Sequence, residues 1–150
     1  MDSSLRALAD YFLAQKDALA VDPTLIDPQF LPHVFILDVE RAPTISLRIR
    51  LIGTALDHFF RRPLIGHHLE EFIHGPRGAD VIASFHHCAE TKEPLWMRQV
   101  VKLPERMPRF VEGVAVYLEP DRIYGGLAIG ELYNPRVESG FESTLLSRPG

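Results

Sequence analysis

Residues 48–72 read RIRLIGTALDHFFRRPLIGHHLEEF, and this stretch decides the fold of the chain. Its first residues continue an alternation that begins at Ile45, with aliphatic side chains at every second position through Leu51 and serine or arginine between them. Successive side chains of a strand point to opposite faces of a sheet, so this pattern predicts a strand with one buried face. Ile49 and Leu51 both belong to the aliphatic set, and we expect both to point into the protein interior.

Two short helices are predicted after this strand. Gly53 ends the strand, and Thr54, with an acidic residue three positions later, predicts a capping box that opens the first helix. The second helix follows Gly66 and stops before Gly75 and Pro76. Apolar side chains share one side of each helix, so we expect both helices to cover the sheet. These side chains are Leu56, Phe59, Phe60, Leu69, Phe72 and Ile73.

The apolar patterns elsewhere predict two further helices and four further strands. One helix is amphipathic and lies at the N-terminal end, and the other is the longest helix of the chain. The C-terminal segment has too little apolar content to hold itself in place, so we expect it to be mobile. The helices are predicted over residues 3–20 and 78–92, and the strands over residues 31–39, 95–103, 110–118 and 123–132.

This order of elements predicts one α+β domain in three parts. Residues 1–22 hold the N-terminal amphipathic helix, residues 23–133 the core and residues 134–150 a flexible tail. In the core, a five-stranded antiparallel sheet carries the short helices and one longer helix on one face. The cone-shaped fold of small isomerases and dehydratases is the alternative architecture, but it has no early strand pair like the one predicted here.

The stretch 48–72 also resembles the signature of the small PAS-type domains of bacterial proteins. That signature runs from an arginine through a strand and Gly-Thr to a short helix, and then to a glycine before an acidic short helix. The earlier helix and strand fit as well, so the resemblance spans roughly residues 5 to 132. The positions that carry it are Arg50, Gly53, Thr54, Leu56, Phe59, Arg61, Leu64, Gly66, Leu69 and Phe72.

One position departs from the family pattern. The family usually has glycine where Phe60 stands, and glycine suits a left-handed backbone at a helix end. We therefore expect the turn at Phe60 and Arg61 to be built differently here. The resemblance implies a PAS-like stand-alone sensory or regulatory domain that acts in signal transduction.

Size and composition indicate one cytoplasmic domain that binds neither nucleic acid nor membrane. A chain of 150 residues forms one domain with a single core. Its net charge of −4 argues against nucleic-acid binding, which needs a concentrated basic face. Cys88 is the single cysteine, which fits a reducing compartment, and no uncharged stretch is long enough to cross a bilayer. The local group of Arg48, Arg50, Arg61 and Arg62 is interpreted as solvated or paired.

The N-terminal helix carries an apolar stripe formed by Leu5, Leu8, Phe12 and Leu19. Such a stripe needs a partner surface. The helix either packs on the sheet of its own chain or pairs with a second copy of the chain. The resemblance to PAS-type domains favours a homodimer with these four residues at its interface, and the sequence leaves both arrangements open.

Histidine is the residue type that points toward a metal or a cofactor. Adjacent histidines on a helix diverge by about 100°, so neither His67 and His68 nor His86 and His87 can form a pair of metal ligands on one face. The family resemblance brings haem into consideration, with His86 as its axial ligand. The resemblance also brings flavin into consideration. The reactive cysteine of a flavin photoreceptor would precede the long helix, however, and Cys88 lies inside that helix. The sequence assigns no metal and leaves the cofactor open.

A cavity between the sheet and the helices is the predicted ligand site, because apolar periodicity places several side chains on inward faces. The function we expect is a non-catalytic sensory or regulatory module that binds a small molecule, a protein partner or both. A signal would leave by contact with a separate signalling protein or by a change of oligomeric state. The residues predicted to form the pocket are Ile49, Leu51, Phe59, Phe72, Phe85, His86, Val114 and Ile129.

Two alternatives to a sensory function stay open. One is a small α+β enzyme whose acid–base site combines His74, His86 and Glu112 in the cavity, although spacing alone does not bring these residues together. The other is a purely structural dimerisation domain. The sequence contains no phosphate loop, nucleophile elbow or metalloprotease motif, which favours a non-catalytic function.

Overall fold

The computed structural model describes residues 2–73, 75–101, 103, 107–132 and 142–145. Its strands form one antiparallel sheet in the order β2-β1-β5-β4-β3-β6. The predicted α+β class and the five antiparallel strands β1 to β5 are confirmed, and β6 adds a sixth strand beside β3. The bounds are β1 Val34–Glu40, β2 Ser46–Ile52, β3 Leu95–Val101, β4 Arg109–Leu118, β5 Arg122–Leu132 and β6 Glu142–Leu145.

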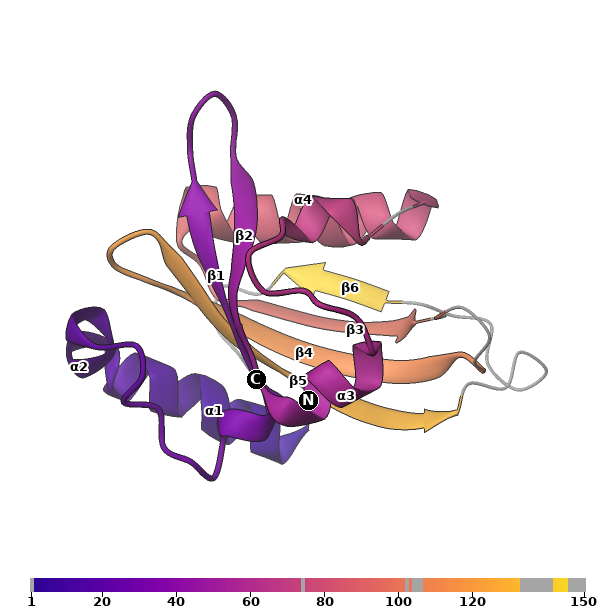
Figure 1. Cartoon of the computed structure of the whole chain (residues 1–150), viewed down its shortest axis with the longest axis horizontal. Helices are drawn as coiled ribbons and strands as arrows, with labels where there is room; N and C mark the ends of the chain where they lie inside the picture. Colours follow the sequence, from indigo (N-terminus) through magenta and orange to yellow (C-terminus); the bar gives the residue numbers. More distant parts are fainter. Residues whose placement is uncertain (1, 74, 102, 104–106, 133–141, 146–150) are drawn as a thin grey trace.

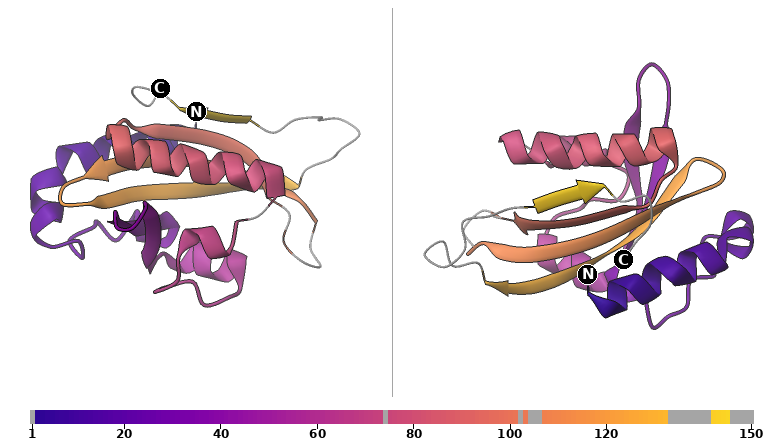
Figure 2. Two further views of the ribbon diagram at one scale, coloured as in Figure 1. Left: turned by 90° about the horizontal axis from the view of Figure 1, so that it is seen from above. Right: turned by 180° about the vertical axis from the view of Figure 1, so that it is seen from behind.

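Helices cover both faces of this sheet. Figure 1 shows α4 on one side of the sheet and α1 with α2 on the other, and Figure 2 shows the same arrangement from two further directions. Helix α3 and the 3-10 turn η2 contribute to the core on the side of α4. The bounds are α1 Ser3–Ala14, α2 Lys16–Val21, η1 Leu31–His33, α3 Thr54–Phe60, η2 Leu69–Glu71 and α4 Gly75–Thr91.

Helices α1 and α2 bury one face of the sheet. Leu5 and Leu8 are 3% exposed, and Phe12 and Leu19 are fully buried. The ring of Phe12 lies edge-on to that of Tyr124 in β5, with 5.5 Å between the ring centroids. Burying a side chain of this size stabilises the fold by about 1.5–3 kcal/mol. The predicted dimer interface therefore needs correction, because these four side chains pack within their own chain and present no surface to a second copy.

The other face of the sheet packs against α4 and α3. Phe85 of α4 meets Phe35 of β1 edge-on, with 5.9 Å between the ring centroids. Cys88, one helical turn further along α4, is fully buried, and so is Leu56 of α3. These residues belong to one apolar cluster, which surrounds the candidate site described below.

A bulge in β2 separates two residues that the sequence placed together. Leu37 of β1 pairs with Ile49, but the preceding Ile36 pairs with Leu51, so Arg50 is an extra residue without a partner. An extra residue shifts the alternation of faces by one position. Ile49 consequently belongs to the cluster beneath α4, whereas Leu51 packs against the cluster beneath α1. The prediction that Ile49 and Leu51 share an inward face is wrong for this reason.

Helix α3 begins differently from the prediction. Its N-cap is Gly53, and no side chain bonds to the cap, so the expected capping box at Thr54 does not form. Gly53 is required by close packing, because a Cβ at this position would lie 2.5 Å from the carbonyl carbon of Pro32. At the other end Arg61 takes the left-handed conformation, with φ 55° and ψ 38°. Arg61, and not Phe60, is therefore the left-handed residue at this end of the helix.

Residues 142–145 lie within the range predicted to be a flexible tail. They form β6 and pair with β3 from Leu95 to Arg98, so that prediction is wrong for this segment. The remainder of the predicted tail, residues 134–141 and 146–150, lies outside the described residues. Among the described helices, none is both long enough and apolar enough to cross a membrane.

Candidate functional site

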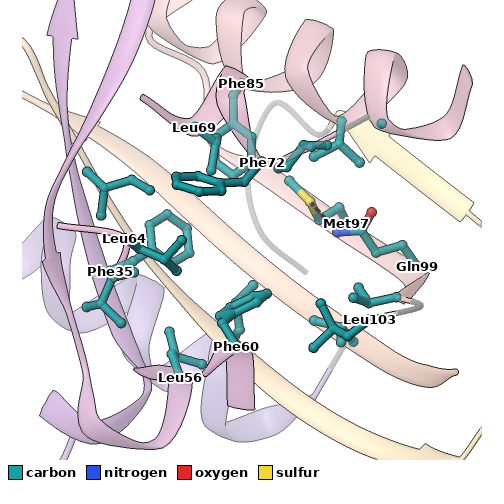
Figure 3. Close-up of a pocket in the computed structure, with 18 of the residues that line it drawn as sticks. Phe35, Leu56, Phe60, Leu64, Leu69, Phe72, Phe85, Met97, Gln99 and Leu103 are labelled. Atoms are coloured by element: carbon teal, nitrogen blue, oxygen red, sulfur yellow. Dashed lines mark hydrogen bonds between the residues drawn. The ribbon is translucent and has the colours of Figure 1, made fainter. Parts of the chain in front are cut away.

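A cavity of about 360 Å³ lies between the sheet, α3, η2 and α4. Figure 3 shows Phe60, Phe72 and Phe85 around this space, with Met97 and Gln99 contributed by β3. Its volume is at the lower end of the range of sites that bury small molecules. It is lined by Phe35, Leu37, Ile49, Ile52, Leu56, Phe60, Arg62, Leu64, Leu69, Phe72, Ile73, Gly78, Val81, Phe85, Met97, Gln99, Val100, Val101, Leu103, Val111 and Leu127.

The lining is apolar with two exceptions. Of the lining residues that the structure describes, only Arg62 and Gln99 carry polar side chains. Aromatic and aliphatic walls with a few polar groups are the usual composition of a small-molecule site, because the walls give affinity and the polar groups fix orientation. The arrangement therefore suits a ligand with a mainly apolar body.

Arg62 lies at the solvent side of the cavity. It is exposed, and its guanidinium carbon lies 4.8 Å from the centroid of the Phe72 ring. This distance is within the range of a cation–π contact, which holds the charged group against the aromatic wall. Within the described ranges, no carboxylate pairs with Arg62. Its hydrogen-bond donors are consequently available to a bound group.

Gln99 is the second polar group of the lining. Its Nε2 atom donates to the Sδ atom of Met97 at 3.6 Å, and a thioether is only a weak acceptor. Among the described residues, no group donates to the side-chain oxygen of Gln99. The amide thus has an unused acceptor and a weakly used donor beside the apolar walls.

A polar contact holds η2 against α4. Nε2 of His86 lies 2.7 Å from Oε2 of Glu70, and the other carboxylate oxygen of Glu70 accepts from the backbone N–H of Leu47 at 3.2 Å. Glu70 therefore connects three elements: η2, α4 and β2. The neighbouring residues Leu69 and Phe72 line the cavity, so this contact fixes part of its wall.

A second polar cluster supports the same wall from the edge of the sheet. Glu40 accepts from Arg48 Nε at 2.9 Å and contacts His68 Nε2 at 2.6 Å. Two hydrogen bonds lower the pKa of Glu40 from 4.5 to about 2: that from His68 has the largest effect, and that from Arg48 the next largest. Arg48 also donates to the carbonyl oxygen of Gly66 at 2.6 Å. The cluster therefore holds the chain before η2 against β2.

The structure places three of the predicted pocket residues in the cavity and moves the others elsewhere. Ile49, Phe72 and Phe85 line it. Ile129 packs against the surrounding cluster and Phe59 is buried, but neither of them lines the cavity. Leu51 and Val114 face α1 instead, and His86 contacts Glu70 instead of lining the cavity.

The misplacement of Val114 has a physical reason. Val114 and Val116 of β4 pack beneath α1, whereas Ala115 and Tyr117 belong to the cluster beneath α4 and Val111 lines the cavity. Alternation in a sequence identifies two faces but does not show which of them has a cavity.

The remaining predicted sites are resolved in different ways. Glu112 lies on the α1 face, where Oε2 accepts from Trp96 Nε1 at 2.6 Å, so it is not brought together with His86. His74 lies outside the described residues. No histidine occurs among the described residues that line the cavity, and His86 is therefore not placed to serve a haem there. Burial raises the pKa of the Cys88 thiol to about 12, which makes it unreactive as a nucleophile.

The arginine group divides into two pairs. Arg48 pairs with Glu40, and Arg50 pairs with Asp38 at 3.2 Å. Arg61 and Arg62 are exposed, and neither pairs with a carboxylate in the part of the chain that the structure describes. Arg62 and Gln99 were not predicted as pocket residues, because a single polar residue beside an apolar one gives no periodic signal.

Known proteins supply no assignment for this site. No model of a protein family matches the chain, and no curated protein matches it in sequence.

Proposed function

We propose that this chain is a non-catalytic PAS-like sensory or regulatory module that binds a small molecule in the cavity beneath α4. The observation that supports the proposal is the cavity itself, which has a volume of about 360 Å³. Its lining is apolar except for the polar side chains of Arg62 and Gln99. A five-stranded antiparallel sheet in the order β2-β1-β5-β4-β3, with its helices inserted between β2 and β3, is compatible with a PAS-like fold.

A ligand in this cavity would act on the wall made by α3 and η2. That wall is attached to the rest of the chain by a few contacts, among them the hydrogen bonds of Glu70 and Glu40. A ligand that fits one arrangement of the wall better than another shifts the population toward that arrangement. The change would then be sensed by a partner protein that contacts this surface.

Thermal unfolding with a panel of small apolar, acidic and basic compounds tests the proposal. A compound that binds the folded state raises the midpoint of unfolding, by an amount that depends on its concentration. Val81 lines the cavity from α4 and is 3% exposed, so Val81→Phe would place a ring in the ligand space. Ile82 is the next residue of the same helix and does not line the cavity, which makes Ile82→Phe the matched control.

We expect the stabilising compounds to lose their effect in Val81→Phe and to keep it in Ile82→Phe. The proposal fails if no compound of the panel stabilises the wild-type chain. It also fails if Val81→Phe, while folded, responds to the same compounds as the wild type.

A second candidate function is protein–protein interaction through the outer side of the segment formed by residues 2–31, in a homodimer or with a separate signalling protein. Four of the six large apolar residues that are exposed in the described chain belong to this segment: Leu13, Val21, Leu25 and Leu31. Val21 and Leu25 are the most exposed of these four, at 87% and 58%. Sedimentation velocity over a range of concentrations tests this function, with Val21→Ser/Leu25→Ser as the variant. Self-association that the double variant abolishes would support it, and identical monomers would argue against a homodimer.

A further inference from the structure

The charge of Arg62 is balanced differently from that of four other arginines. Arg41, Arg48, Arg50 and Arg122 each lie within 3.2 Å of a carboxylate oxygen. Arg62 has its cation–π contact with Phe72 and no carboxylate within the described ranges. A cation at the edge of an apolar cavity is therefore left with its donors free.

The environment of Arg62 suits a carboxylate, whose single negative charge one guanidinium group can balance. The guanidinium group presents two parallel N–H donors, which match the two oxygens of a carboxylate. The guanidinium carbon lies 4.8 Å from the centroid of the Phe72 ring, and this cation–π contact favours a position of the charged group beside the aromatic wall. An ion pair in such a partly apolar setting is stronger than one in open solvent, because the effective dielectric constant is lower.

The rest of the cavity sets the chemistry of the ligand body. Phe35, Phe60 and Phe85 contribute aromatic walls, and no carboxylate side chain occurs among the described lining residues. A basic ligand would therefore find no oppositely charged partner in the lining, whereas an apolar ring or alkyl chain contacts it throughout. The volume of about 360 Å³ fits a body of one ring or a medium-length chain.

Resting on the proposed function, we propose that the ligand is a small monocarboxylic acid with an apolar body. Its carboxylate binds Arg62 at the edge of the cavity, and its ring or alkyl chain lies between α4 and the sheet. Gln99 offers one amide to a further polar atom of the ligand.

The experiment is isothermal titration calorimetry with acids and their uncharged amides. The probes are octanoate against octanamide, and phenylpropionate against phenylpropionamide, so that each pair shares one apolar body. Arg62→Gln removes the cation but keeps hydrogen-bond donors. Arg61→Gln removes the neighbouring exposed cation, which does not line the cavity.

We expect the wild-type chain to bind at least one of the acids about tenfold more tightly than its amide, the difference that one charged hydrogen-bonded contact gives. Arg62→Gln is expected to bind that acid and its amide about equally, and Arg61→Gln to keep the preference. Arg62→Lys keeps the charge without the two-pronged geometry and is expected to recover part of the preference. Circular dichroism checks that each variant is folded.

Three results would overturn this inference. The first is equal binding of acids and amides by the wild type. This result would keep small-molecule binding but show that the carboxylate is not the group that Arg62 recognises. The second is an equal loss of preference in Arg61→Gln and Arg62→Gln, which would indicate a general charge effect in place of a contact. The third is failure of all four probes to bind while another compound of the thermal panel does. Failure of every compound would instead overturn the proposed function.

Discussion

Nε2 of His86 lies 2.7 Å from Oε2 of Glu70, and this contact joins the long helix α4 to the turn that forms one wall of the cavity. Through its other oxygen, Glu70 also holds the backbone N–H of Leu47 in β2. His86, which the sequence predicted to line the ligand pocket, thus positions the wall of that pocket through Glu70. Both side chains are about three-tenths exposed, so the contact is partly protected from water.

Breaking this contact is expected to cost about 1 kcal/mol of unfolding free energy, the usual value of a charged hydrogen bond that is partly exposed. Chemical denaturation of Glu70→Gln, His86→Gln and the double variant measures the coupling between the two side chains. His87→Gln is the control, because His87 lies 3.9 Å from Glu93 and both of these side chains are about half exposed. A coupling energy of zero between Glu70 and His86 would show that the contact does not stabilise the wall.

The stability of the protein is expected to depend on Glu40 at acidic pH. Its pKa is lowered from 4.5 to about 2 in the folded chain, most by the hydrogen bond from His68 and next by that from Arg48. The stabilisation is therefore complete above about pH 4.5 and is lost as the pH falls toward 2. Urea denaturation at a series of pH values should show that Glu40→Gln loses less stability than the wild type over this window. Glu90→Gln, at an exposed position of α4, should behave as the wild type does. If the free energy of unfolding depended on pH in the same way in all three proteins, Glu40 would not be the source of the acid sensitivity.

Helix α1 is expected to be part of the fold. Phe12 is fully buried against β5, so Phe12→Ala should lower the free energy of unfolding by about 3–5 kcal/mol. Leu13 is 41% exposed, and Leu13→Ala should change stability by no more than about 0.5 kcal/mol. Thermal or chemical denaturation compares the two variants. Equal and small effects would indicate that α1 is not packed on its own sheet.

Gly125 of β5 is expected to tolerate no side chain. A Cβ there would lie 2.6 Å from the carbonyl oxygen of Val114 and would overlap the ring of Phe35. Gly125→Ala should therefore destabilise the protein by about 1–3 kcal/mol. Gly130 lies in the same strand, where the nearest atom to a Cβ is a carbonyl oxygen at 3.2 Å, so Gly130→Ala should cost less. Denaturation curves test the ranking, and a larger loss in Gly130→Ala would contradict it.

The thiol of Cys88 should react with a disulfide reagent only when the chain unfolds. Burial raises its pKa to about 12, and the thiolate is the reactive form. At about pH 8 the native chain is expected to react at least about a hundredfold more slowly than the denatured chain. Ala83 is exposed on the same helix, so Ala83→Cys in a Cys88→Ala background should react rapidly when folded. Rapid labelling of native Cys88 would show that its side chain is not buried between α4 and the sheet.

The secondary structure was largely predictable, because side-chain periodicity carries it directly. Alternation gave the strand that contains Ile49, and the helical stripes of α1 and α4 were visible as apolar residues three and four positions apart. The split between α1 and α2 and the start of α4 differ from the prediction by a few residues, which is usual where helix ends depend on tertiary contacts.

The composition of the site was less predictable, since it depends on features that have no period. The bulge at Arg50 sends Leu51 to the other face, and nothing in the sequence marks an extra residue in one strand. Val114 was predicted on the cavity side because alternation alone does not distinguish the two faces of β4; it packs beneath α1, whereas Val111 of the same strand lines the cavity. Arg62 is recognisable only once the ring of Phe72 and the partners of the other arginines are known.

Ligand binding between α4 and the sheet is the central claim, and methyl-selective NMR during titration with the compound that stabilises the chain most in the thermal panel tests it most directly. The two faces of one sheet supply the comparison. Leu64, Val81 and Leu127 line the cavity, whereas Leu8 of α1 and Val116 of β4 belong to the cluster on the opposite face of the sheet. We predict saturable shifts of the first three methyl groups and little change in the other two. Unchanged spectra, or shifts concentrated at Leu8 and Val116, would contradict the account.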